Sequence, residues 1–271
     1  MLKTILSGRK VVENSALNYL GVQVARLLLT SAAYAARGLR GGYQESAESA
    51  ALRRDGIISF PDFLEEAHFE EVKREFGLAG TAGRFQPIDD GGTRVERHTL
   101  AQDEWRKLPA VRSLLEDQRL LGILHAAERR PVEPRDVWFD EIRRGAAPDS
   151  QTQMHTDVFF NSHKVWLFLE DVSLDDGPLC YMKGTHRASF QRMVFEYRQS
   201  IRFKQLTDYS FRLSQDELRR FPAREVKLVV GANTLVIANT RGFHRRGDAL
   251  PGRRRKQIHF AVRENPFSLK S

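Results

Sequence analysis

The carboxyl-terminal half of the chain is a series of short apolar or alternating segments that starts at Val137. Gly, Pro, Asp and Asn separate these segments, and many short strands of this kind are typical of a β sandwich or barrel. The segments are VWFDEIR (137–143), VFF (158–160), KVWLFLEDV (164–172), LCYM (179–182), VKLVV (226–230), NTLVIAN (233–239) and KQIHFAVRE (256–264). They predict a mainly β core.

Helical signals flank this core, so we expect an α+β protein that is mainly β. A short strand around Ile57–Phe60 precedes a predicted helix, for which Asp62 and Glu65 have the spacing of a capping box. Residues 103–129 also have helical periodicity. A second capping box, Ser214 with Glu217, predicts a short helix within residues 189–225, which interrupt the strands.

Residues 1–48 differ in texture from the rest and are predicted to be an amphipathic segment with a linker, ahead of a domain at 49–271. The stretch 15–36 is rich in Ala and Leu and has polar residues at helical spacing on one face. Arg26 in the middle of this run argues against a membrane span, which needs about 20 nearly uncharged residues. We expect a helix that docks on its own domain or on a second copy; the alternative is peripheral contact with a membrane surface.

The chain of 271 residues is basic, with 43 Lys and Arg against 35 Asp and Glu. This balance favours an anionic partner, such as an acidic substrate or an anionic membrane surface, and we expect no specific nucleic-acid binding. Cys180 is the single cysteine, so an intrachain disulfide is excluded. We therefore predict a cytoplasmic protein, with the inner face of the membrane as an alternative place.

The stretch MHTDVFF (154–160) contains His155 and Asp157, which on an extended strand would point to the same face. His244, at the end of a later apolar segment, offers a third ligand. Two histidines and one carboxylate form the facial triad of non-haem Fe(II) oxygenases, which leaves coordination positions open for a cosubstrate and dioxygen. We therefore predict that these three residues bind iron and are the catalytic residues.

A 2-oxoglutarate cosubstrate would need a fixed cation for its distal carboxylate, and the planar guanidinium of arginine suits that role. Arg255 lies on a segment that would return beside His244, with Gln257 and His259 on the same face. Arg253 and Arg254 compete with Arg255 on spacing alone.

The chain resembles the phytanoyl-CoA dioxygenase family of Fe(II)/2-oxoglutarate-dependent oxygenases over roughly residues 50–262. The residues that carry the resemblance are DGIISFPDFLEEAHFEEVKREF (55–76), MHTDVFF (154–160), KVWLFLEDVSLDDGPLCYMKGTHR (164–187) and GFHRRG (242–247) with RRRKQIHF (253–260). The resemblance implies a double-stranded β-helix core, that is, a cupin-like jelly roll. It also implies Fe(II), 2-oxoglutarate and O₂ as cofactor and cosubstrates.

Residue by residue, the resemblance implies that His155, Asp157 and His244 bind iron, that Arg255 binds the 2-oxoglutarate carboxylate and that Trp166 packs beside this cosubstrate. Family members often have small residues after the distal histidine, and this chain has Arg245 and Arg246 there. The two arginines would add positive charge to the mouth of the pocket.

The implied reaction is hydroxylation of an unactivated C–H bond of a small, anionic or lipid-like substrate, with an acyl-CoA, a lipid or a lipid-linked sugar as candidates. Related halogenases lack the carboxylate ligand, so Asp157 favours hydroxylation. Residues 189–225 are predicted to form a lid over the substrate. The alternatives are desaturation or epoxidation, a cupin-like metal enzyme without 2-oxoglutarate, and a non-catalytic module that binds a membrane or nucleic acid.

Overall fold

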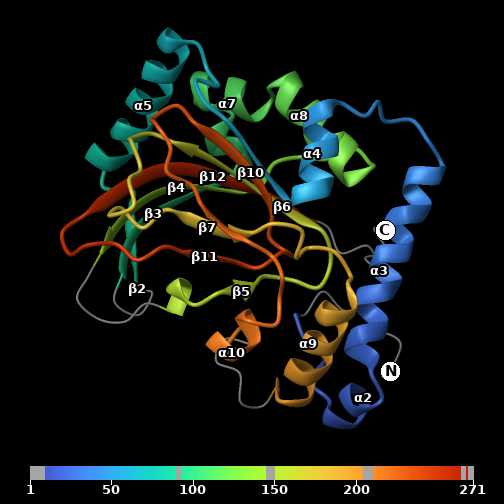
Figure 1. Cartoon of the computed structure of the whole chain (residues 1–271). Helices are drawn as coiled ribbons and strands as arrows, with labels where there is room; N and C mark the ends of the chain where they lie inside the picture. The colour runs from blue at the N-terminus through green and yellow to red at the C-terminus, as the bar shows by residue number, and fades with distance from the viewer. Residues whose placement is uncertain (1–9, 90–92, 145–149, 204–209, 264–266, 268–271) are drawn as a thin grey trace.

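A computed structural model describes residues 10–89, 93–144, 150–203, 210–263 and 267. Two antiparallel sheets face each other (Figure 1). The seven-stranded sheet has the order β1 (Ile57–Phe60), β10 (Leu235–Asn239), β6 (Ser162–Phe168), β12 (Arg254–Arg263), β4 (Arg135–Arg144), β3 (Thr93–Leu100) and β2 (Gln86–Asp89). The five-stranded sheet has the order β8 (Phe211–Arg212), β5 (His155–Thr156), β11 (His244–Arg246), β7 (Leu179–Met182) and β9 (Glu225–Lys227). The prediction of a mainly β, jelly-roll core is confirmed.

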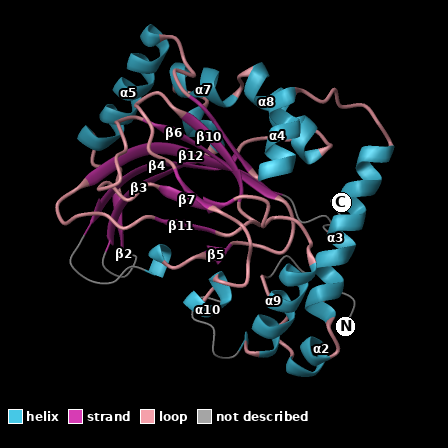
Figure 2. Ribbon diagram, in the orientation of Figure 1, coloured by secondary structure: helices cyan, strands magenta, loops and turns pink. Residues whose placement is uncertain are grey.

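Helices cover the outer face of the seven-stranded sheet (Figure 2). They are α4 (Ala47–Asp55), α5 (Glu66–Thr81), α7 (Pro109–Leu115) and α8 (Gln118–Glu128), and the short α6 (Gln102–Trp105) precedes α7. Their apolar side chains pack against alternate residues of the central strands, such as Phe139, Leu167 and Ile237, and form the main hydrophobic core. Because successive strand residues point to opposite faces, the residues between them face the other sheet.

That inner face of the seven-stranded sheet is polar over three neighbouring strands. Arg255, Gln257 and His259 of β12 alternate with the core residues Ile258 and Phe260. The β12 register places Gln257 opposite Asp140 of β4, and Asp140 lies opposite Arg97 of β3. A row of buried polar groups between two sheets costs free energy unless it is paired or meets a ligand, so this face is where a functional site is expected.

The amino-terminal segment folds as α2 (Ser15–Tyr19) and α3 (Val22–Leu39), and both helices pack on α9 (Phe190–Ile201) along one side of the sandwich (Figure 1). The polar residues of these helices turn inward: Asn18, Gln23, Arg26 and Thr30 are buried, whereas Leu28 and Leu29 are about half exposed. The expected docking on the protein's own domain therefore occurs through the polar face. No helix among the described residues is both long and apolar enough to span a bilayer.

Two local predictions are wrong. Asp62 does not cap a helix: α5 begins at Glu66 with Glu65 as its N-cap residue, and Asp62 has a φ of 47°. The VFF segment (158–160) is not a strand; its side chains form a small separate cluster with Phe267. The second capping box, Ser214 with Glu217, is present at the start of α10 (Gln215–Leu218).

Candidate metal centre

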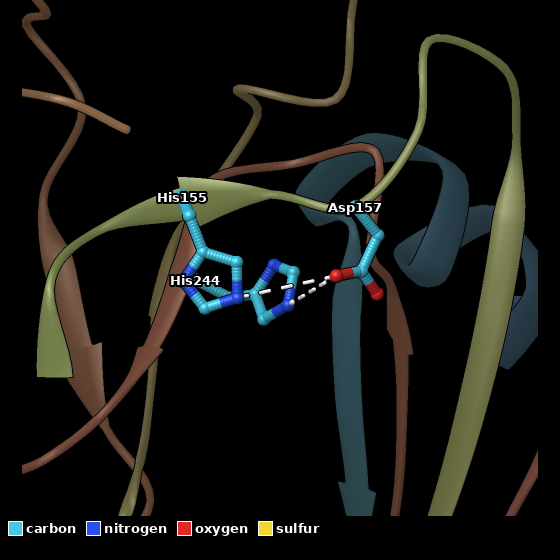
Figure 3. Close-up of side chains that lie close together, drawn as sticks. All are labelled: His155, Asp157 and His244. Carbon is cyan, nitrogen blue, oxygen red and sulfur yellow. Dashed lines mark ion pairs between the residues drawn. The ribbon is translucent and has the colours of Figure 1, made fainter. Parts of the chain in front are cut away.

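His155, Asp157 and His244 converge between the two sheets (Figure 3). His155 opens β5, and His244 opens β11, which pairs directly with it. Asp157 follows β5, and its amide donates a hydrogen bond to the Thr240 carbonyl at 3.0 Å. One nitrogen from each histidine and one oxygen of Asp157 lie within 4.8 Å of one another. Two segments far apart in the sequence thus bring three donor atoms close together.

The hydrogen bonds of the two histidines suit metal binding. His155 Nδ1 lies 2.8 Å from the Gln153 carbonyl and His244 Nδ1 lies 3.0 Å from the Gly242 carbonyl. A carbonyl only accepts a hydrogen bond, so each Nδ1 carries the proton and each Nε2 keeps a free lone pair. Both Nε2 atoms face Asp157 Oδ1, at 3.9 Å from His155 and 3.7 Å from His244. The donor set, two imidazole nitrogens and one carboxylate oxygen, therefore fits Fe(II) in kind.

Charges around the triad favour its metal-binding protonation state. Burial, and after it the charge of His244, lowers the pKa of His155 to about 3. Burial also lowers the pKa of His244. Burial alone would raise the pKa of Asp157, but the ammonium of Lys164 and then the two histidines hold it well below its usual range. The site at neutral pH therefore has two neutral imidazoles and one carboxylate.

Lys164 of β6 is a neighbour of the triad that the sequence reading missed. Its ammonium lies 2.8 Å from Asp157 Oδ2, so one carboxylate oxygen is occupied and Oδ1 is left toward the histidines. Lys164 stands two residues before Trp166 on the same face of the strand, and both line the cavity beside the triad. That spacing was the available signal, because residues i and i+2 of a strand share a face.

A cavity of about 350 Å³ opens beside the triad, and we call it the metal-site cavity. All five residues predicted for the site line it: His155, Asp157, His244, Trp166 and Arg255. Besides the triad, the lining residues are Ile88, Val95, Arg97, Asp140, Ile142, Gln151, Lys164, Trp166, Leu179, Arg246, Arg255, Gln257 and His259. No residue of 189–225 that the structure describes lines it, and the lid role of that segment stays a prediction.

Arg255 is distinguished from its two neighbours by burial. Its guanidinium donates to the Gly177 carbonyl, its Nε has no partner, and burial lowers its pKa to about 9, so it stays charged at neutral pH. Arg253 pairs with Asp176 at the surface, and Arg254 is exposed. Arg245 and Arg246 also diverge: Arg245 pairs with Glu225 at 2.7 Å, and Arg246 lines the metal-site cavity.

A second charged group that the sequence did not indicate also lines this cavity. Arg97 donates two hydrogen bonds to Asp140, at 2.7 and 2.8 Å, and His259 Nδ1 lies 3.1 Å from the same carboxylate. Burial opposes ionisation of Asp140, but His259 and Arg97 hold its pKa well below the usual range. This cluster links the neighbouring strands β3, β4 and β12 and makes this part of the cavity lining polar.

Comparisons with known proteins agree with this architecture. Solved structures with the same fold include the epimerase SnoN in complex with Fe³⁺, alpha ketoglutarate and nogalamycin RO (15% identity, 80% of this chain and 82% of that chain, TM-score 0.58). The carbocyclase SnoK from nogalamycin biosynthesis is 18% identical over 82% of this chain and 87% of that chain, with a TM-score of 0.54. HygX from Streptomyces hygroscopicus, with nickel and 2-oxoglutarate bound, is 17% identical over the same shares, with a TM-score of 0.55.

No curated protein matches the chain in sequence. Residues 52–234, however, match the family described as phytanoyl-CoA dioxygenase (PhyH), which is more than half of the chain. The matched range contains His155 and Asp157. His244 lies ten residues after the end of this range, and the fold brings it to the other two residues. The chain belongs to the phytanoyl-CoA dioxygenase family, whose members are oxygenases that depend on Fe(II), 2-oxoglutarate and O₂.

Proposed function

We propose that this protein hydroxylates an unactivated C–H bond of a small anionic substrate, with Fe(II) held by His155, Asp157 and His244. The observation that carries the proposal is the convergence of these three donors, with both Nε2 atoms free, in a cavity that also contains Arg255. The bound iron would supply the oxidation, in which 2-oxoglutarate and O₂ are consumed, succinate and CO₂ are released, and one oxygen atom enters the substrate.

The residues of the chain have separate roles in this proposal. Arg255 binds the distal carboxylate of 2-oxoglutarate, because it is a buried cation with an unused donor facing polar neighbours. Trp166 forms one wall beside that carboxylate. Lys164 holds Asp157 Oδ2, so that a single carboxylate oxygen faces the metal position. Burial of the triad keeps bulk water away from the reacting carbon.

Charge in the metal-site cavity supports an anionic substrate. Four cationic side chains line it against two carboxylates, and Arg97 and Lys164 pair with those two. Arg255 is assigned to 2-oxoglutarate, and we assign Arg246, which lines the same cavity, to an acidic group of the substrate. Carboxylates, phosphates and the phosphates of an acyl-CoA share this chemistry.

The decisive experiment is anaerobic titration with Fe(II) and 2-oxoglutarate, followed by a screen for succinate release with small acids, acyl-CoAs and acidic lipids beside their neutral analogues. His155→Ala and Asp157→Ala should abolish succinate release, and full turnover in either variant would refute the ligand assignment. Arg246→Gln should raise KM for acidic substrates at least tenfold, with Arg245→Gln as the matched control that points out of the cavity.

The mass of the product separates the remaining reactions. Hydroxylation or epoxidation adds one oxygen atom, desaturation removes two hydrogen atoms, and epimerisation leaves the mass unchanged. An unaffected Arg255→Ala variant would favour a cupin-like metal enzyme without 2-oxoglutarate. Salt-dependent binding to a membrane or nucleic acid without iron uptake would favour a non-catalytic module.

Peripheral contact with an anionic membrane is a second proposal, for the amino-terminal segment. The outward face of α3 contains exposed Leu28, Leu29 and Leu39, and Arg40 follows at its carboxyl-terminal end. An apolar strip with basic residues at its border is the pattern of helices that lie on anionic membrane surfaces. Such contact would suit a lipid, or a lipid-linked sugar, as the substrate.

A further inference from the structure

A buried ion pair lies behind the triad, on the side of α9. Arg192 and Glu196 stand one helical turn apart and are almost completely buried. The Arg192 guanidinium donates from Nε at 3.0 Å and from one terminal nitrogen at 2.8 Å to Glu196 Oε1. Burial of two charges is costly, so a pair of this kind is a weak source of stability and calls for another role.

The remaining donors of Arg192 reach both segments that carry the metal ligands. Nη1 donates to the Arg241 carbonyl at 2.8 Å and to the Thr185 carbonyl at 3.1 Å, and Nη2 donates to Thr156 Oγ1 at 3.1 Å. Thr156 is the residue between His155 and Asp157. The guanidinium also stacks on the ring of Phe243, 4.6 Å from its centroid, and Phe243 immediately precedes His244.

Thr156 completes a direct link between the two ligand segments. Its hydroxyl accepts the hydrogen bond from Arg192 and donates to the same Arg241 carbonyl at 2.8 Å. Its side chain thus points to the opposite side of the strand from His155 and Asp157, whose side chains point toward His244 (Figure 3). A rotation of the strand at Thr156 would move both His155 and Asp157.

We propose that Arg192 is a positioning residue for the metal centre: held by Glu196, it fixes through Thr156 and the Arg241 carbonyl the relative position of the two segments that carry the triad. This inference rests on the ligand assignment above. Arginine suits this role better than lysine would, because the planar guanidinium donates hydrogen bonds in several fixed directions at once. Groups that orient metal ligands in this way typically contribute 10–100-fold to metal affinity or activity.

The network of contacts around Arg192 and Glu196 extends into the amino-terminal segment, which lies outside the residues that match the family. Gln23 of α3 donates to Glu196 Oε2 at 3.0 Å, and Arg26 donates to Gln23 at 2.9 Å. Arg26 also lies over the ring of Phe159, 3.8 Å from its centroid, just beyond Asp157. Residues of the amino-terminal segment therefore support the metal-ligand segments from outside the sandwich.

The test compares metal affinity with stability in four variants, of which Arg192→Lys is the conservative one. Thr156→Val keeps the shape of the side chain and removes the hydroxyl that joins the segments. Arg192→Met combined with Glu196→Gln removes both charges of the pair together, and the glutamine keeps an acceptor for Gln23. Arg198→Met changes an exposed arginine of the same helix and serves as the matched control.

Anaerobic Fe(II) titration, the visible charge-transfer band of the Fe(II)–2-oxoglutarate complex and thermal unfolding are measured for each. We expect Thr156→Val and the double variant to bind Fe(II) roughly 10–100-fold more weakly, with a shifted band. Arg192→Lys should recover only part of the affinity, and Arg198→Met should match the wild type.

Wild-type affinity and an unshifted band in Thr156→Val, or in the double variant, would overturn the positioning role and leave Arg192 as a support of α9 alone. If the double variant fails to fold, Thr156→Val decides the matter by the same two measurements. Failure of the wild-type protein to bind Fe(II) would instead refute the proposed function, so the two failures are distinguishable.

Discussion

We expect the affinity for 2-oxoglutarate to depend most strongly on Arg255. Substitution by Ala should raise KM for 2-oxoglutarate by two orders of magnitude or more, because a charge-assisted, bidentate contact in a buried site is worth about 3 kcal/mol. Arg255→Lys should recover only part of this, since an ammonium is not a planar fork. Succinate release at varied 2-oxoglutarate concentration measures both.

The neighbouring arginine is the control for that prediction. Arg254 precedes Arg255 on β12 and is exposed, so Arg254→Ala should leave KM for 2-oxoglutarate within a factor of two of the wild type. Equal effects of the two substitutions would mean that surface charge, and not a carboxylate site, controls affinity.

His186 gives the molecule a pH dependence of stability that is separate from the metal. It is buried and donates from Nε2 to the Arg53 carbonyl at 3.0 Å, and burial lowers its pKa to about 3. The unfolded value is about 6.5, so below that pH the unfolded chain binds a proton that the folded chain rejects. The contribution to the free energy of unfolding is therefore lost as pH falls from about 6.5 toward 3, by about 1.4 kcal/mol per pH unit.

Urea unfolding of the iron-free protein at pH about 7 and about 5.5 measures this slope. His186→Gln removes the titrating group and should reduce the change in the free energy of unfolding between these two pH values by about 1.3 kcal/mol. A variant with the wild-type slope would show that other buried histidines account for the whole dependence.

At the residue scale, the sequence predicts groups that are recognisable by type and spacing. His155, Asp157, His244 and Arg255 meet in one cavity as expected, because strand alternation decides which side chains share a face. Lys164 and Arg192 were missed because each acts through a contact made in three dimensions: Lys164 meets Asp157 between the two sheets, and Arg192 reaches Thr156 from a helix 36 residues away.

At the scale of elements, tertiary contacts decide where local signals agree with the structure. The capping box at Ser214 is confirmed because both of its hydrogen bonds form within α10. The predicted cap at Asp62 is wrong because Asn233 takes the next two amides: Phe63 donates to its carbonyl at 3.0 Å, and Leu64 donates to its side chain at 3.1 Å. The chain is thus held in an irregular turn until Glu65, and α5 starts later.

The orientation of α3 is a clearer case in which tertiary contacts override a local sequence signal. Periodicity predicts one polar and one apolar face, and the ordinary expectation is that the apolar face docks. The surface offered by α9 is polar, however, and Glu196 and the Ser200 carbonyl accept from Gln23 and Asn18. The helix therefore docks through its polar face, which the sequence of the helix alone does not indicate.

This orientation separates two adjacent leucines. Leu27 is fully buried, whereas Leu28 is 45% exposed. Leu27→Ala should lower the free energy of unfolding by about 2–5 kcal/mol, because it removes buried methyl groups and leaves a cavity. Leu28→Ala should change it by no more than about 0.5 kcal/mol. Urea unfolding of both variants measures the difference, and equal losses would contradict the inward orientation of Leu27.

At the scale of the whole molecule, the sequence predicts the sandwich but not all of its strands. The long apolar segments became β4, β6, β7, β10 and β12, since each has enough alternating residues to be recognised. The two-residue β5 and β8 have no such signal, and they exist because pairing with neighbours holds them in place. His155 lies on β5, Asp157 follows it and His244 opens the three-residue β11, so the site depends on the fold as a whole.

The exposed apolar face of α3 leads us to predict that the molecule binds the surface of an anionic membrane. The basic chain should bind vesicles that contain phosphatidylserine more tightly than neutral vesicles, and added salt should weaken that binding. Leu28→Gln combined with Leu29→Gln should reduce vesicle binding roughly tenfold or more, because burial of each leucine is worth about 1.5 kcal/mol or more. Leu78→Gln, at an exposed leucine of α5, is the control and should bind as the wild type does.

If the double variant binds vesicles as tightly as the wild type, α3 is excluded as the membrane contact. A dimer in solution that the double variant dissociates would instead show that a second copy of the chain covers this face.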